Sequence, residues 1–504
     1  MNSLGTISSI SEDSFKIYFA TNNGFFSYDK LDETIVYEYD LSKTISNPDI
    51  KLLMYDRFRD YFWIVNRGKL LFKSSLGIYW RESDIDIDFI ANFRIGCNEE
   101  YIIINDSFNY IYIDPYNGNE VDLNRTDRML TESRNNENII WSSFLDTHPI
   151  DISEYIPPEN WDVKNLKLFN YDSSKEISIT SYYIDTNNDK WFGTDNNLII
   201  KVPSFSYRME FIRSGPKNPV STISHFYDGN YIFADNSFIR TGRFGRNTIG
   251  ENVFSIFNLY ENSWEYIDVN YGDFGSTDIN DVLVQNNKIY ASTMNGISIY
   301  DLLDEERKFL SIGSGLYDNA IWEIEKYNNI IYAATSKGIN EVSIVLDDVI
   351  KTNNKAVKAF DGIEVYDIIF KENIMYASCI NGIYKIDILN EEVVQVTDKA
   401  LRRIEIFENS IIGNDRNLWI INLANGKERK IATNIVNFSL FENHIWINKK
   451  NKAVLYSINS DEQVEYDTNV LPGSKIYNVI ADSSNVIFLT DNGIGLYNWD
   501  AYDE

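Results

Sequence analysis

The sequence predicts an all-β protein of tandem β-propellers, built from about 12 four-stranded antiparallel blade units. Three observations predict this class. The stretch KIYASTMNGISIYD at Lys288–Asp301 has the pattern of a β-hairpin, and close variants of it recur along the chain. The recurrences lie roughly 40 residues apart, which is the length of one propeller blade. Apolar residues alternate with a period near two, whereas a helical repeat would need a period near 3.6.

Each unit is predicted to hold four strands. In Lys288–Asp301 the turn falls at Met294-Asn295-Gly296, where glycine accepts positive φ. This hairpin supplies the second and third strands. A first strand precedes it, as at Ile279–Val284, and a fourth strand follows, as at Val393–Val396 in a later unit. The same hairpin is expected at Lys16–Asp29 and from Ile330, Ile374 and Val486 onward.

The units are too many for one propeller of four to eight blades, so two propellers in tandem are predicted. The segment Arg213–Pro219 contains two prolines and is the preferred linker. We therefore expect an N-terminal propeller over 1–215 with about five blades and an irregular insertion at 126–165. A C-terminal propeller over 216–504 would have about seven blades and an insertion at 241–251. A division into six and six near Asn270–Thr277 is the alternative.

Two units are irregular. The fourth is inferred from spacing alone, with strands expected over Ile139–Leu145 and Ile150–Tyr155. The last unit has three evident strands and ends at Leu496–Trp499. Its fourth strand is expected from the N-terminus or the linker, because such closure removes an exposed sheet edge.

Composition limits the function classes. The chain has 504 residues, 44% of them hydrophobic, and a net charge of −29. Nucleic acid and anionic membrane surfaces would be repelled, so neither is an expected partner. Cys97 and Cys379 lie in strand-like runs and are expected to be buried rather than disulfide-bonded. No apolar run approaches the ~18 residues of a membrane span, so no membrane insertion is expected. The N-terminus lacks the pattern of a signal peptide.

The stretch Asp185–Asp195, DTNNDKWFGTD, carries a resemblance to a known family. With its Asp/Asn turn, aromatic pair and Gly-Thr, it resembles the repeat of two-component-regulator-type β-propellers. Asn197 stands where that repeat usually has glycine, and Thr490–Ile494 and Thr21–Phe25 match its second half. The resemblance implies an extracytoplasmic, ligand-sensing or surface-assembly domain. Double propellers of this kind also occur in the type IX secretion machinery. The chain has no kinase or membrane helix of its own, which departs from the sensor pattern.

Catalytic and metal motifs are sparse. Asp185, Asn187 and Asp189 alternate as in a calcium loop, but the EF-hand glycine and glutamate are missing, so an Asx turn is favoured over Ca²⁺. No other cofactor is expected. The three histidines are His148, His225 and His444, and they lack zinc-ligand spacing. No nucleophile elbow, phosphate loop or dinucleotide fingerprint occurs, which favours a non-enzyme.

The tryptophans and the irregular segments lead to two further predictions. Six tryptophans are assigned to second or third strands and are expected to pack between blades: Trp63, Trp141, Trp191, Trp322, Trp419 and Trp446. Binding is expected where the repeat breaks down, because loops on repeat scaffolds tend to carry function. The candidate ligand- or partner-binding residues in those segments are Tyr155, Trp161, Arg243, Phe244 and Arg246.

Three functions remain open. The preferred one is a non-enzymatic propeller scaffold that binds a partner protein or a glycan-like ligand, as a sensor or as part of a surface or secretion-related assembly. The second is a carbohydrate-active enzyme that uses carboxylates in a central channel. The third is a structural subunit of a filament, virion or envelope complex.

Overall fold

A computed structural model describes most of the chain. The described residues are 4–42, 45, 50–87, 93–105, 110–122, 139–142, 151–158, 161–170, 176–216, 220–226, 229–235, 252–260, 263–268, 279–449, 452–466, 471, 475–483, 485–490 and 493–498. They form two compact units, Asn2–Gly215 and Pro216–Glu504. Every pairing between named strands is antiparallel, and most sheets have four strands, which confirms the all-β, propeller-blade architecture. No helix among these residues is long and apolar enough to cross a membrane.

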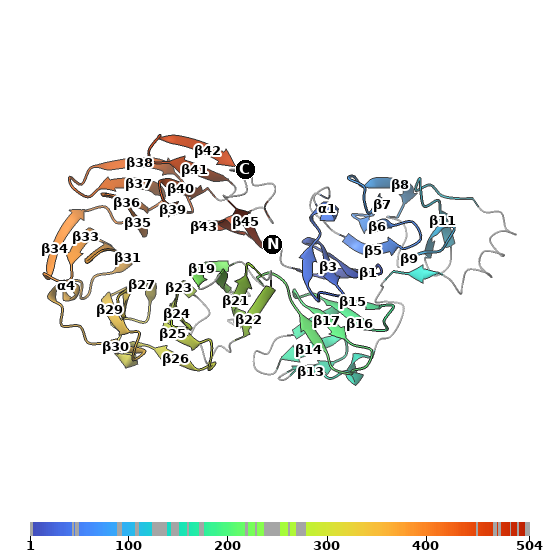
Figure 1. Ribbon diagram of the computed structural model, residues 1–504, viewed down its shortest axis with the longest axis horizontal. Coiled ribbons are helices and arrows are strands. Elements are labelled where there is room, and N and C mark those ends of the chain that lie inside the picture. The colour runs from blue at the N-terminus through green and yellow to red at the C-terminus, as the bar shows by residue number, and fades with distance from the viewer. Residues whose placement is uncertain are drawn as a thin grey trace, which may run out of the picture. The chain divides into compact units, whose positions relative to one another are not determined.

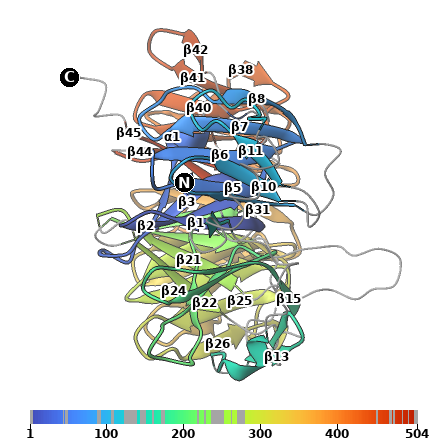
Figure 2. The ribbon, with the colours of Figure 1, turned by 90° about the vertical axis from the view of Figure 1, so that its right-hand side faces the viewer.

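The described part of the unit Asn2–Gly215 contains four sheets. Their strands are β1 (Ile7–Glu12), β2 (Lys16–Thr21), β3 (Gly24–Asp29), β4 (Ile35–Tyr37), β5 (Ile50–Asp56), β6 (Tyr61–Asn66), β7 (Lys69–Ser74), β8 (Arg81–Asp86), β9 (Arg94–Cys97), β10 (Ile102–Asn105), β11 (Tyr110–Ile113), β12 (Ile140–Trp141), β13 (Trp161–Lys164), β14 (Lys167–Asn170), β15 (Glu176–Ile184), β16 (Lys190–Thr194), β17 (Ile199–Val202) and β18 (Glu210–Ile212). Two short helices, α1 (Tyr39–Ser42) and η2 (Ile152–Glu154), lie between strands. Figure 2 shows the β5 to β8 sheet with its strands in sequence order.

The unit Pro216–Glu504 contains seven sheets. Their strands are β19 (Val220–Phe226), β20 (Asn230–Asp235), β21 (Asn252–Asn258), β22 (Ser263–Asp268), β23 (Ile279–Gln285), β24 (Lys288–Thr293), β25 (Gly296–Asp301), β26 (Arg307–Leu310), β27 (Ile321–Tyr327), β28 (Ile330–Thr335), β29 (Gly338–Ser343), β30 (Asp348–Ile350), β31 (Val365–Lys371), β32 (Ile374–Cys379), β33 (Gly382–Asp387), β34 (Glu392–Thr397), β35 (Arg403–Phe407), β36 (Ser410–Asn414), β37 (Asn417–Asn422), β38 (Glu428–Thr433), β39 (Asn437–Phe441), β40 (His444–Asn448), β41 (Ala453–Ser457), β42 (Glu462–Tyr466), β43 (Ile476–Ala481), β44 (Asn485–Thr490) and β45 (Gly493–Asn498). The helices are η3 (Ile312–Ser314) and α4 (Lys355–Lys358).

The seven sheets form a closed ring (Figure 1). The first strand of one sheet contacts the first strand of the next from β19 to β35, and β39 contacts β43 in the same way. The first and last sheets also meet, because β19 contacts β43. The first strands therefore line the centre of the ring, and the fourth strands form its rim. The last sheet has three strands in the described chain, and its predicted fourth strand stays a prediction.

The recurrent hairpin has a common turn. Gly296 opens β25 with φ of 128°, and the Thr293 hydroxyl donates to its carbonyl oxygen at 2.9 Å. The same hydroxyl accepts from the Asn295 N–H at 3.0 Å. The pairs Thr21 with Gly24 and Thr335 with Gly338 repeat this threonine–glycine bond at 2.9 Å. The hairpin motif thus combines a glycine that takes positive φ with a threonine that closes the turn.

Three consecutive first strands, β23, β27 and β31, share a β-bulge. In β23 the register passes from Ile279 to Asp281, so that Asn280 is an extra residue. In β27 the extra residue is Trp322, and in β31 it is Tyr366. A bulge lets two successive side chains turn to one side of a sheet, where a regular strand would alternate them. The feature therefore places two adjacent side chains per strand toward the centre of the ring.

Side-chain hydrogen bonds join the first and last sheets of each unit. In the C-terminal unit the Tyr231 hydroxyl donates to Asp482 Oδ2 at 2.7 Å and accepts from Asn485 Nδ2 at 3.0 Å. These bonds join the first sheet to the last. In the N-terminal unit Thr186 donates to Glu12 Oε2 from its N–H at 3.2 Å and from its hydroxyl at 3.1 Å. In both units, polar contacts thus join sheets that are distant in sequence.

The structure corrects two predictions of strands. The segment expected as a strand over Ile150–Tyr155 holds the 3₁₀-helix η2, whose Asp151 cap accepts from the Ser153 N–H. From the predicted Ile139–Leu145 strand only β12 is present among the described residues, and it pairs with β9 of the third sheet. These two short apolar runs therefore do not form the predicted pair of strands. The Asp151 cap supports a 3₁₀-helix in one segment, and β12 in the other pairs with β9.

The predicted roles of the cysteines and tryptophans are mostly confirmed. Cys97 and Cys379 are free thiols with no solvent exposure. Trp63 and Trp191 are buried on second strands and pack against aromatic rings. Two tryptophans are exceptions. Trp141 lies on β12, which pairs with the first strand β9 of its sheet, and Trp322 lies on the first strand β27. Trp322 takes the bulge position of β27 and lines the centre of the ring.

Candidate functional site

A cavity of about 430 Å³ lies at the centre of the C-terminal ring. Its lining comes from the first strands of six of the seven sheets and the residues next to them. Polar residues dominate the wall, and apolar residues such as Leu283, Ile369 and Ile480 lie between them. A propeller channel of this size accepts a small molecule or one side chain of a partner.

The first strands β23, β27 and β31 each contribute a bulge residue and the residue after it to the cavity. The bulge residues Asn280, Trp322 and Tyr366 all line it, as does the exposed Arg402 in front of β35. The residues that follow them are Asp281, Glu323, Asp367 and Arg403. One ring of charged groups thus lies next to a set of aromatic and polar groups. Two further carboxylates, Glu325 and Glu405, lie two residues farther along their strands.

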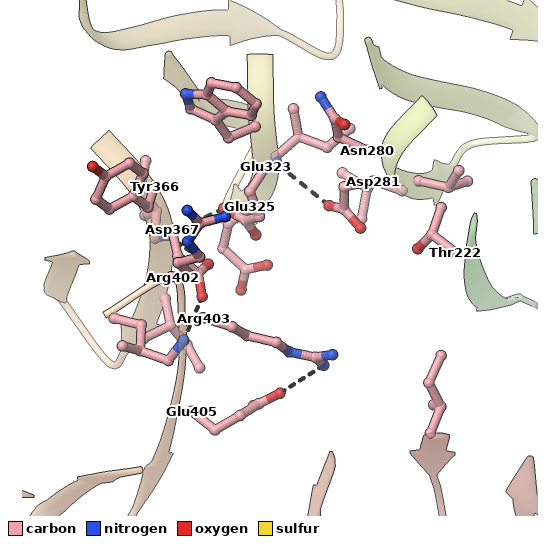
Figure 3. Close-up of a pocket in the computed structure, with 18 of the residues that line it drawn as sticks. Thr222, Asn280, Asp281, Glu323, Glu325, Tyr366, Asp367, Arg402, Arg403 and Glu405 are labelled. Atoms are coloured by element: carbon pink, nitrogen blue, oxygen red, sulfur yellow. Dashed lines mark hydrogen bonds and ion pairs between the residues drawn. The ribbon is translucent and has the colours of Figure 1, made fainter. Parts of the chain in front are cut away.

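The ring of carboxylates is held by the neighbouring sheets. Asp281 Oδ2 accepts from the Ile324 N–H at 3.3 Å, and Glu323 Oε2 accepts from the Ile368 N–H at 3.1 Å. Asp367 Oδ2 accepts from the Ile404 N–H at 2.5 Å. Each carboxylate therefore bonds to the backbone of the next first strand along the chain (Figure 3). The repeated contact fixes these side chains in place and joins adjacent blades.

Arg403 is the cation at the level of this ring. Its Nη2 donates to Glu405 Oε1 at 3.0 Å. Burial alone would lower its pKa, but the surrounding carboxylates of Glu405, Asp367 and Asp281 raise it. Figure 3 shows Arg403 and Glu405 reaching into the same space as Asp281 and Glu325. The guanidinium therefore stays charged and offsets part of the negative charge around it.

The carboxylates exceed the cations. Five acidic and two basic side chains line the cavity, so the fully ionised wall carries three excess negative charges. Among the described residues, Asp281, Glu323, Glu325 and Asp367 have no lysine or arginine within 4.0 Å. Unpaired charges of one sign in a confined space favour protonation of the acids. The site is thus strongly acidic and incompletely neutralised.

Burial raises the pKa values of these acids. It raises the pKa of Asp281 to about 6 and that of Asp367 to about 7. The pKa of Glu325 rises to about 8, first through burial and then through repulsion from Asp281 and Asp367. Burial, with repulsion from Asp367 and Asp281, raises the pKa of Glu323 well above its usual range. Near pH 7, Asp281, Asp367 and Glu325 are therefore partly protonated.

The residues predicted for binding lie elsewhere. Tyr155 is 6% exposed and packs in the core of the N-terminal unit, with its ring 5.9 Å from that of Phe192. Trp161 on β13 makes an edge contact with Phe211 at 5.4 Å. The other three candidates, Arg243, Phe244 and Arg246, lie outside the described residues. The binding roles of all five stay a prediction, and the two described residues have packing contacts.

The candidate calcium loop is satisfied by its own chain. Asp185 Oδ1 accepts from the N–H groups of Asn187 and Asp189, each at 2.9 Å. Its Oδ2 accepts from the Trp191 indole at 3.0 Å. Asp189 Oδ1 accepts from the Ser204 N–H at 2.8 Å. These contacts are those of an Asx turn. Nowhere in the described chain do three or more His, Cys, Asp or Glu side chains group in a way that could hold a metal ion.

The acidic ring was missed in the sequence, although a signal for it exists. The first strands read INDVL from Ile279, IWEIE from Ile321 and VYDII from Val365. An acidic residue takes the third position in each. The predicted units were defined by the hairpin turn, and binding was predicted in the irregular loops, whereas the acidic residues recur in the first strands. Channel carboxylates were named only as a general possibility.

Comparison with known proteins gives structural similarities only. No protein-family model matches the chain, and no curated protein matches its sequence. The chain is similar to the extracellular domain of a putative one component system from B. thetaiotaomicron, at 14% identity and TM-score 0.46, over 98% of this chain and 75% of that one. The extracellular domain of a putative hybrid two component system from the same organism matches at 16% identity and TM-score 0.39, over 99% and 82%.

A third solved structure is PorZ, an essential surface component of the type IX secretion system of Porphyromonas gingivalis. It matches at 11% identity and TM-score 0.36, over 99% of this chain and 86% of that one. Two of these three structures are extracellular domains of the regulator class that the repeat resembles, and the third belongs to type IX secretion. At these identities no residue role passes from them to this chain.

Proposed function

We propose that this chain is a non-enzymatic β-propeller protein that binds a ligand in the channel of its C-terminal ring. The ligand is a small glycan-like molecule or an exposed group of a partner protein. The observation that carries the proposal is the 430 Å³ cavity, to which six first strands contribute side chains. Propeller blades surround a central channel. Here the wall of that channel is polar and charged.

The biological setting is part of the same proposal. The protein acts as a sensor or as a component of an extracytoplasmic, surface or secretion-related assembly. The repeat resemblance supports this setting, and the similar solved structures are extracellular or surface proteins by their own descriptions. The net charge of −29 fits a protein that stays away from nucleic acid and anionic lipid.

A blocked channel tests the proposal. The full chain is presented to a glycan array and to a library of short peptides, and then Leu283→Trp is tested in the same way. Leu283 lines the cavity, so the indole would occupy it. The matched control is Leu303→Trp, which adds the same side chain at a position 74% exposed in the turn after β25. We expect the first variant to lose binding and the second to keep it. Binding that survives Leu283→Trp, or no binding of either class, would overturn the proposal.

A second function has one observation in its favour. A glycoside hydrolase needs a carboxylic acid that stays protonated near neutral pH beside a second carboxylate. Glu325, with its pKa raised to about 8, lies in one cavity with Asp281 and Asp367. Hydrolysis of glycans by the wild type that is lost in Glu325→Gln would favour this enzyme. Glycan binding without turnover would exclude it.

A further inference from the structure

We propose that the channel of the C-terminal ring recognises an organic ammonium group carried on a short carbon chain. The proposal rests on the proposed function, since it names the chemical class of the channel ligand. It combines three independent features of the cavity, which are its charge, its aromatic and apolar wall, and the separation of its carboxylates. Each of them points to a cation of extended shape.

The first feature is the charge balance. When all five acids are ionised, three excess negative charges face one cavity, and Arg403 is paired with Glu405 at 3.0 Å. Unpaired charges inside a protein are costly, so a cation that enters the channel gains strong electrostatic attraction. An anionic or neutral ligand would leave this charge in place.

The second feature is the wall around the acids. Trp322 and Tyr366 occupy bulge positions on adjacent sheets, and both line the cavity. Aromatic faces attract ammonium groups, with tryptophan as the strongest. Leu283, Ile369 and Ile480 offer apolar contacts for a carbon chain between the charged groups.

The third feature separates an organic cation from a metal ion. In the described residues no three carboxylates or other metal-ligating side chains meet closely enough to hold one ion. The reason is their anchoring, because Asp281, Glu323 and Asp367 each bond to the backbone of a different neighbouring strand. Carboxylates spread around a channel fit a group with several N–H donors on a flexible stem better than a compact ion that requires close ligands.

The ammonium group can come from several sources. A polyamine, a lysine side chain of a peptide and an amino sugar all present it, and a cavity of about 430 Å³ can hold any of these groups. The shared chemistry is a primary amine that is protonated at neutral pH. Binding would place this amine against one or two of the cavity carboxylates, such as Asp281, Glu323 or Glu325, with its carbon atoms near Trp322 and Tyr366.

Calorimetric titration of the full chain tests the proposal. The probes are cadaverine, spermidine, a peptide with one lysine, and glucosamine, and their uncharged counterparts are 1,5-pentanediol, the acetyl-lysine peptide and N-acetylglucosamine. We expect at least one amine to bind and its counterpart to bind at least tenfold more weakly. Among the amines, the strongest binder identifies the source of the group.

Variants assign the binding to the channel. Glu323→Gln retains an oxygen that can accept from the Ile368 N–H and removes the carboxyl group that would ionise against the amine, so the fold is kept. It should weaken amine binding at least tenfold. Glu392→Gln makes the same change on the exposed outer strand β34 and should leave binding unchanged. Unfolding curves of both variants establish that they are folded.

Three outcomes would overturn the inference. Equal binding of an amine and its uncharged counterpart would remove the charge argument. Equal affinity in Glu323→Gln and the wild type would place the amine outside the channel, and specific competition by Ca²⁺ would favour a metal ion. A neutral glycan that loses binding in Leu283→Trp but keeps it in Glu323→Gln would contradict this inference and leave the proposed function standing.

Discussion

Asp367 and Ile404 connect two adjacent blades through one hydrogen bond, in which the carboxylate Oδ2 on β31 accepts from the backbone N–H on β35 at 2.5 Å. Glu323 and Asp281 make the same connection at the two preceding junctions. The groups that give the channel its charge are therefore also structural links between sheets. Changes at these residues should affect both blade stability and ligand binding, and substitutions can separate the two roles.

Asp367→Ala should destabilise the junction between β31 and β35. It leaves the Ile404 N–H without its acceptor, and an unsatisfied buried donor costs about 1–3 kcal/mol. Asp367→Asn keeps an oxygen at that place and should cost less. Hydrogen exchange of peptides from β31 and β35 in the full chain measures the effect. Equal exchange in the alanine and asparagine variants would mean that the bond contributes nothing to the junction.

The stability of the C-terminal ring should fall as the pH rises from about 5 to about 8. The pKa values of Asp367 and Glu325 are about 7 and about 8 in the folded chain, against about 4 when unfolded. Between these values the folded state binds more protons, so deprotonation favours unfolding. Each such group contributes at most about 1.4 kcal/mol per pH unit.

Unfolding curves across this pH range, with Glu325→Gln as the comparison, measure that slope. Glu325 lies in one cavity with Asp281, Glu323, Asp367, Arg403 and Glu405. Its substitution removes one titrating group from that cavity, so the slope should become shallower. The variant should also be more stable than the wild type at pH 8. A wild-type slope near zero would mean that these acids ionise at ordinary pKa values.

Glu12→Ala should destabilise the N-terminal unit by about 3 kcal/mol or more. The substitution breaks the buried ion pair of Glu12 with Lys30 and removes the carboxylate that balances the lysine charge. Glu12 is 3% exposed and accepts from Lys30 Nζ at 2.7 Å as well as from Thr186. Lys69→Ala is the control, since its pair with Glu82 is more than half exposed and should cost under about 1 kcal/mol. Chemical denaturation compares the two. Equal losses would show that burial of the pair is unimportant.

Gly296→Ala should cost about 3 kcal/mol, whereas Gly362→Ala should cost about 1–2 kcal/mol. Both glycines have positive φ, which an alanine adopts only with strain. At Gly296 a Cβ would also collide with the Leu310 carbonyl oxygen, while at Gly362 it would meet nothing within 4 Å. Thermal unfolding measures the difference, and similar losses at both sites would mean that the β25–β26 backbone yields to the added carbon.

The fold could be predicted from the sequence because the same hairpin, with the same turn residues, recurs along the chain. The pairing of Thr293 with Gly296, and its equivalents, places the same bond in each turn, so spacing alone located many of the blades. The weak unit near Ser153 was assigned wrongly for the same reason. It has no such turn, and the Asp151 cap supports a 3₁₀-helix there.

The site did not follow from the sequence because the bulge breaks strand alternation. A regular strand would turn Asn280 and Asp281 to opposite faces, yet both line the cavity. Trp322 was predicted to pack between blades because it was assigned to a second or third strand, whereas it lies on the first strand β27. The charge of the channel also depends on a ring of sheets that brings Asp281, Glu323 and Asp367 together from three repeats. A single repeat therefore carries no visible site.

The number of protons released when an amine binds tests the central claim most directly. Cadaverine is titrated into the full chain at pH 7 in buffers of different ionisation enthalpy, beside Glu325→Gln and Glu392→Gln. If the amine enters the channel, acids that are partly protonated at this pH must release protons, and Glu325→Gln should release fewer than the wild type or Glu392→Gln. Binding without proton release, or release that Glu325→Gln leaves unchanged, would contradict the claim that the channel carboxylates form the binding site.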